Sequence, residues 1–129
     1  MFTDAGALAS ALDRGAQRSL LAAETVMRHS AQTLVKRVQH NASGRPGPRV
    51  ITGKYRASWM SDVHRSGPAV VGDVGTAAQQ ARRLEFGFVG VDSLGRHYNQ
   101  PPFPHLGPAV GQAGPALVRA LGHAVTEAL

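Results

Sequence analysis

The feature that most constrains the fold is a long N-terminal stretch without proline, running from Asp4 to about Ala42. Apolar residues recur in it in steps of three and four: Leu8, Leu12, Ala16, Leu20, Ala23, Met27, Ala31, Leu34 and Val38. This period predicts one amphipathic helix over about 4–42, capped by Thr3 or Asp4 and weakened at Gly15. Such a helix is about 55–60 Å long, more than a domain of this size covers, so we expect part of it to pack on another subunit.

A glycine- and proline-rich loop follows over 41–51, and we expect it to be exposed and mobile. After it, Tyr55–Val63 and Ala69–Val74 carry β-tolerant residues on either side of a Gly-Pro turn, which predicts a β-hairpin. Alternation along the first segment puts Trp59 on its buried face and Arg56 on the opposite face. The only tryptophan of the chain is therefore expected to anchor the core.

The remaining elements are shorter and their bounds are softer. Residues 76–84 predict a short helix, and a third short strand over 84–88 is the alternative. Residues 89–98 predict a protruding hairpin or ordered loop around a turn sequence. Residues 106–129 predict a closing helix, in which Pro115 is expected to cause a kink or a restart.

These elements together predict an α+β fold. We expect the long N-terminal helix and the C-terminal helix to pack on a small, mainly antiparallel β-sheet. A chain of 129 residues fits one domain. We therefore expect a single domain over 1–129, with a helix over about 4–42, a β-rich middle over about 51–104 and a closing helix over about 106–129.

The composition limits the class of protein without choosing a partner. The chain carries 14 Lys and Arg against 8 Asp and Glu, a net charge of +6. A basic surface attracts nucleic acid, acidic protein and anionic lipid alike. Two interpretations therefore stay open: a solvated surface whose arginine content reflects the codon bias of a GC-rich genome, or a nucleic-acid-binding face. The absence of cysteine excludes disulfides and thiolate metal sites. No apolar run approaches the length of a membrane span, so we expect a soluble protein with no membrane contact.

No catalytic set stands out in the sequence. Four carboxylates are scattered over different predicted elements: Asp62, Asp73, Glu85 and Asp92. Ser58 and Ser93 lack the glycine context of a nucleophile elbow. The nearest approach to a metal site is a zinc set of His97, His105 and Asp92 on neighbouring loops, which we keep as a minor hypothesis. We therefore expect neither an enzyme nor a cofactor.

Three short motifs follow the long helix in order: Thr52-Gly-Lys-Tyr-Arg-Ala-Ser58, Ala81-Arg-Arg-Leu-Glu-Phe-Gly87 and Pro102-Phe-Pro-His-Leu-Gly-Pro-Ala109. Each combines a turn former with an apolar or aromatic anchor, which is typical of chain reversal and docking. In order and spacing they resemble the motifs of the small head-to-tail joining proteins of long-tailed double-stranded DNA phages. This is the neck or tail-completion family that includes the HK-type "gene ten" minor tail component.

The resemblance implies a structural virion protein at the junction between the head and the tail, assembled in the host cytoplasm. It implies a homo-oligomeric ring, with a hexamer favoured. The expected partners of the ring are connector or stopper proteins and tail-terminator or tail-tube proteins, and a contact with genomic DNA is also compatible with the resemblance. A basic nucleic-acid-binding module is the alternative. We expect packing to be anchored by Trp59, Phe86 and Phe103. We expect assembly to use Arg14, Arg18, Arg45, Arg49, Arg56 and Glu85, with Arg56 and Glu85 as ion partners across the sheet or between subunits.

Overall fold

The computed structural model describes residues 4–129, so Thr3 lies outside the described residues. Along the chain the elements are α1 (Ala5–Asn41), α2 (Lys54–Ala57), β1 (Met60–Ser66), β2 (Ala69–Gly75), α3 (Ala81–Phe86), β3 (Phe88–Val91), β4 (His97–Gln100) and α4 (Leu106–Ala128). The predicted α+β class, with long helices at the two ends of the sequence, is confirmed. The antiparallel strands form two separate two-stranded sheets, β1–β2 and β3–β4.

The first helix matches its prediction closely. α1 has 37 residues and begins after Asp4, whose Oδ1 accepts a hydrogen bond from the N–H of Ala7 at 2.6 Å. The helix does not break at Gly15, which is buried. A methyl group at this position would lie 3.8 Å from the Leu129 side chain, an ordinary van der Waals distance, so the end of α4 packs beside this part of α1.

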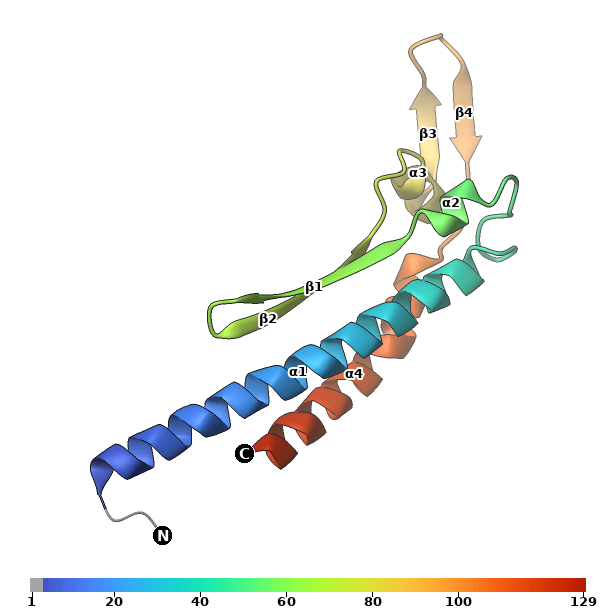
Figure 1. Ribbon diagram of the computed structural model, residues 1–129. Coiled ribbons are helices and arrows are strands. Elements are labelled where there is room, and N and C mark those ends of the chain that lie inside the picture. Colours follow the sequence, from blue (N-terminus) through green and yellow to red (C-terminus); the bar gives the residue numbers. More distant parts are fainter. Residues whose placement is uncertain (1–3) are drawn as a thin grey trace.

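The second long helix runs antiparallel to α1 and alongside it (Figure 1). The helix does not restart at Pro115, because α4 continues through this residue. Pro115 removes the hydrogen bond to the carbonyl of Gly111. Both residues are exposed, so water can satisfy that carbonyl and the helix tolerates the proline.

The β1–β2 hairpin lies along α1 (Figure 1). Its register pairs Val63 with Gly72, and Val63 is buried. The terminal carbon of Met27 on α1 lies close above Gly72, where a Cβ would be 2.7 Å from it. The hairpin face that carries Val63 is therefore the one that packs on the helix.

The first strand begins later than predicted. Residues 54–57 form the short helix α2, not part of a strand. Gly53 precedes it with a φ of 83°, a left-handed conformation that favours glycine, and the carbonyl of Gly53 accepts the N–H of Ala57 at 3.0 Å. The proposed division of this segment into alternating faces is wrong for that reason, because side chains on a helix do not alternate between two sides.

The core is small and lies near the C-terminal end of α1. Val38, Trp59 and Ala109 are buried together, and partly buried side chains pack against them: Leu34, Val35, Tyr55, Val74 and Leu106. Many large apolar side chains are exposed elsewhere, on both helices and on the β3–β4 hairpin. Extensive exposed apolar surface is typical of a protein that is covered by partners.

Candidate assembly surface

The motif over 52–58 turns the chain and is followed directly by Trp59. The hydroxyl of Thr52 accepts the N–H of Lys54 at 3.3 Å, and Gly53 supplies the left-handed turn. Tyr55 on α2 and Trp59 just beyond its end then both face the core, where Trp59 is only 6% exposed. Their rings meet edge to face with centroids 6.3 Å apart.

The motif over 81–87 ties α3 to the segment before α4. The carbonyl of Leu84 accepts the N–H of Phe103 at 2.6 Å. Gly87 has a φ of 78°, and a Cβ there would lie 2.8 Å from the carbonyl oxygen of Gln100, so only glycine permits this approach. Phe86 is 73% exposed. Its predicted role as a core anchor is wrong, because α3 turns Leu84 and Glu85 inward and leaves Phe86 outside.

The motif over 102–109 brings a buried histidine to the same place. His105 is fully buried. Its Nδ1 lies 2.8 Å from the carbonyl oxygen of Phe103 and 2.9 Å from Oε2 of Glu85, and because both are acceptors, we assign the hydrogen to Nδ1. Nε2 then accepts the hydroxyl of Tyr55, 2.5 Å away. The carbonyl of His105 accepts the side-chain amide of Asn41 at 3.1 Å, which fastens this residue to the end of α1.

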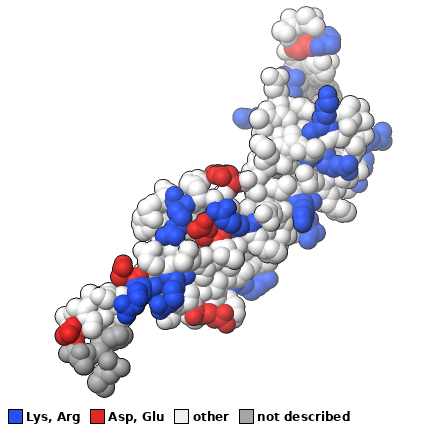
Figure 2. Space-filling view, viewed as in Figure 1, with Lys and Arg blue, Asp and Glu red and all other residues white. Residues whose placement is uncertain are grey.

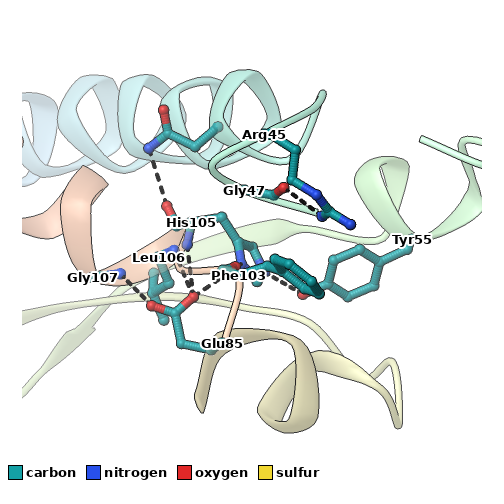
Figure 3. A network of polar contacts seen from close by, with 9 residues as sticks. Arg45, Gly47, Tyr55, Glu85, Phe103, His105, Leu106 and Gly107 are labelled. Carbon is teal, nitrogen blue, oxygen red and sulfur yellow. Dashed lines mark hydrogen bonds and ion pairs between the residues drawn. The ribbon is translucent and has the colours of Figure 1, made fainter. Parts of the chain in front are cut away.

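Glu85 caps the start of α4. Its carboxylate accepts the N–H groups of His105 at 2.8 Å, Leu106 at 3.0 Å and Gly107 at 2.8 Å (Figure 3). These amides have no partner within the helix, and a negative charge at a helix N-terminus is also favoured by the helix dipole. Burial acts to raise the pKa of Glu85, but the three backbone N–H groups outweigh it and hold the pKa below its ordinary value. The carboxylate is therefore kept ionised by the helix that it caps.

Tyr55 is held in its neutral form. Burial, together with the nearby charge of Glu85, raises the pKa of Tyr55 to about 12. A protonated hydroxyl is the donor that Nε2 of His105 requires. The two pKa shifts therefore favour one hydrogen-bonding pattern, with Glu85 charged and Tyr55 neutral.

The three motifs thus meet in one place, which we call the three-motif cluster: Tyr55, Trp59, Glu85, Phe103 and His105. Trp59 packs edge to face on His105 with ring centroids 5.7 Å apart. Its Nε1–H is buried and has no hydrogen-bond partner among the described residues. The cluster joins α2, α3 and the start of α4 to the end of α1.

Beside this cluster lies an open groove of about 680 Å³, which we call the basic groove. Its walls are the 42–53 loop, α2, and the residues Gln80, Leu84 and Phe103. Its cationic side chains are Arg45, Arg49, Lys54 and Arg56. Lys and Arg side chains gather over this end of the molecule in Figure 2.

The loop that forms one wall is partly buried, contrary to its predicted exposure. Gly47 and Pro48 are buried, and a Cβ at Gly47 would lie 1.9 Å from the carbonyl oxygen of Asn41. Arg45 donates to the carbonyl of Gly47 at 3.0 Å and places its guanidinium 3.7 Å from the ring centre of Phe103. The half-buried Phe103 therefore connects the loop to the start of α4.

The other predicted assembly residues lie in different surroundings. Arg56 donates to the hydroxyl of Ser43 at 3.1 Å, and Glu85 binds the start of α4, so the two do not form an ion pair within the subunit. Arg14 and Arg18 lie on α1, far along the sequence from the groove residues, and Arg18 donates to the carbonyl of Ala128 at 3.1 Å. The structure brings Arg45, Arg49 and Arg56 together and leaves Arg14 and Arg18 apart from them.

The zinc hypothesis for His97, His105 and Asp92 is wrong. Both ring nitrogens of His105 are engaged inside the core, and Asp92 binds Arg96 across its own turn. Within residues 4–129, the metal-ligating side chains that converge are Asp62, His64 and Asp73 on the exposed face of β1–β2. These groups are exposed, and His64 already pairs with Asp62.

The sequence interpretation missed the role of His105 and Tyr55. The signal was the position of His105 directly before a helix whose first turn contains a proline, with a carboxylate 20 residues earlier in another motif. A pairing over that separation depends on the fold, so the motifs alone did not indicate it.

Comparison with known protein families gives a match. The model of the HK97-gp10-like family, described as "Bacteriophage HK97-gp10, putative tail-component", matches residues 6–87. The chain belongs to this family. It is therefore a structural tail component of a phage, and a component of the virion. The match spans α1 to α3 and includes the first two motifs, whereas the third motif lies beyond it.

No curated protein and no solved structure gives a significant match to this HK97-gp10-like chain. Among the described residues, no helix is both long enough and apolar enough to cross a membrane.

Proposed function

We propose that this tail component is a neck subunit that joins the DNA-filled head to the tail, as part of a homo-oligomeric ring. The observation that carries the proposal is the exposure of apolar side chains at both ends of an elongated molecule (Figure 1). A subunit with different contact surfaces at opposite ends forms head-to-tail contacts, which close into a ring when the rotation between copies permits. A hexamer is favoured by analogy with the symmetry of phage tails.

One of these surfaces is the first part of α1. Leu8 is 43% exposed and Leu12 is 66% exposed, and they lie one helical turn apart. This part of α1 precedes Gly15, where the end of α4 packs. An amphipathic helix with an uncovered apolar face gains free energy by packing on another chain.

The other surface is the β3–β4 hairpin with the end of α3. Val89 is 78% exposed, Leu94 is 75% exposed and Phe86 is 73% exposed. The hairpin projects away from both long helices in Figure 1. Its turn is ordered by Asp92, which accepts the backbone N–H groups of Leu94 at 2.9 Å and Arg96 at 2.8 Å. Phe86, displaced from its expected place in the core, belongs to this surface.

Native mass spectrometry of the purified protein and cryo-EM of the neck in purified virions test the proposal. We expect a closed oligomer at the head–tail junction. The variant Leu12→Glu should shift the protein toward monomers, and Ser10→Glu, an equal charge on another side of the same helix, should not. A protein that is strictly monomeric and absent from the neck would contradict the proposal.

A second candidate is nucleic-acid binding, supported by the cationic side chains in Figure 2. This function predicts that binding to duplex DNA weakens with salt, with a slope of about −0.9 for each phosphate contacted. Binding to a connector protein without measurable DNA binding would rule it out.

A further inference from the structure

We infer that the basic groove is a docking site for an acidic, apolar-containing segment of a neighbouring virion protein. The inference rests on the proposed function, since a neck subunit must bind a neighbour. It goes further by naming the surface and the chemistry of its occupant.

The charges of the groove are available to a partner. Arg45, Arg49, Lys54 and Arg56 line it, and no Asp or Glu is among its lining residues. None of these cations forms an ion pair within residues 4–129. Arg45 donates a hydrogen bond to a carbonyl and Arg56 donates one to a hydroxyl, and neither acceptor carries a charge. A concave surface with one sign of charge attracts groups of the opposite sign, so the occupant should carry carboxylates or phosphates.

The groove is also pre-formed, because contacts within the subunit hold its walls in place. Gly47 packs against the end of α1, Pro48 is buried and Arg45 lies on the ring of Phe103. Gly53 fixes the turn into α2 on the other wall. A pre-formed site avoids the free-energy cost of ordering a loop during binding.

The apolar lining favours protein over DNA. Ile51 is 93% exposed and Val50 is 41% exposed, and both line the groove with Pro48 and Leu84. A DNA backbone presents phosphates and sugars, which would leave these side chains without apolar partners. A protein segment that alternates carboxylates with apolar side chains matches both the charge and the apolar walls.

The test uses NMR spectroscopy of the full chain with three probes. The first is a short peptide of alternating Glu and Leu, the second is the same peptide with Gln in place of Glu, and the third is a short DNA duplex. We expect the Glu peptide to shift the backbone amides of 42–56 and 80–84. The Gln peptide and the duplex should leave these amides unchanged at the same concentration.

Paired variants locate the binding. Arg49→Glu with Lys54→Glu should weaken binding of the Glu peptide about tenfold or more, because two cation–carboxylate contacts become repulsive. Arg119→Glu, an exposed cation on α4, should leave it unchanged. An unchanged circular dichroism spectrum and melting temperature show that the paired variant still folds.

Two results would overturn the inference: no shift with the Glu peptide at millimolar concentration, or equal shifts with the Gln peptide or the duplex. A protein found in the neck ring whose groove ignores the Glu peptide would refute the docking site and leave the proposed function intact. A protein absent from the neck whose groove binds the Glu peptide would refute the proposed function alone.

Discussion

The two ends of α1 have different surroundings. Near its C-terminal end, α1 meets the three-motif cluster, where buried rings, a buried histidine and a capped helix N-terminus are joined by short hydrogen bonds. Near its N-terminal end, Leu8 is 43% exposed and Leu12 is 66% exposed. We conclude that the stability of the subunit is concentrated at the cluster, and that the opposite end is suited to contact with other chains.

The largest expected effect is on the cluster side. Trp59→Ala removes a buried aromatic ring and should lower the free energy of unfolding by about 3–5 kcal/mol. Leu12→Ala, at the other end of α1, should lower it by less than about 0.5 kcal/mol, because an exposed side chain loses little packing. Urea denaturation at a fixed protein concentration measures both. Equal losses in the two variants would refute the proposed difference between the ends.

The next effect comes from the cap of α4. Glu85→Ala removes the acceptor of three backbone N–H groups and should cost about 2–3 kcal/mol. Glu85→Gln keeps one carbonyl oxygen and should cost about 1 kcal/mol. Because the pKa of Glu85 is lowered by folding, its contribution is present above the ordinary value of 4.5 and is lost as pH falls through the lower folded value. Urea titrations at several acidic pH values should show this loss in the native chain and a smaller one in Glu85→Gln.

A smaller effect is expected at Tyr55. Tyr55→Phe leaves Nε2 of the buried His105 without its donor and should cost about 1 kcal/mol. Folding raises the pKa of Tyr55 to about 12 from an ordinary 10.0, so its contribution is full below pH 10 and is lost as pH rises toward 12. Ultraviolet titration of the phenolate should show one of the two tyrosines titrating late. A Tyr55→Phe protein that keeps the late-titrating group would contradict the assignment.

Phe86 is expected to have the smallest effect on the stability of the subunit. Its effect on oligomer formation should be readily measurable. Phe86→Ser should change the free energy of unfolding by no more than about 0.5 kcal/mol, because the ring is already in solvent. The same change should reduce oligomer formation in native mass spectrometry. A loss of several kcal/mol in the isolated subunit would mean that Phe86 packs within it after all.

The sequence predicted what depends on local pattern. The 3.6-residue period gave α1 nearly to the residue, and a Gly-Pro turn between β-tolerant segments predicted the β1–β2 hairpin. Errors arose where a single residue decided the geometry. Gly53 turns the start of the first motif into a helix, which β-propensity alone did not indicate.

The candidate site was harder to predict because its contacts are distant in sequence. The motifs indicated that Trp59, Glu85 and Phe103 mattered, but not that Glu85 caps a helix that begins 21 residues later. Phe86 was misplaced for a related reason. The direction of its side chain depends on where α3 sits, and that position is set by contacts with the third motif.

The contact at Gly87 brings the two ends of the β3–β4 hairpin together where the hairpin joins the body of the subunit. The backbone enters the hairpin at Gly87 and returns at Gln100 and Pro101, which lie in direct contact with that glycine. The chain therefore leaves and rejoins the body at one point, and the length of the hairpin can vary without moving α3 or α4. The reach of the hairpin is thereby separated from the packing of the folded body.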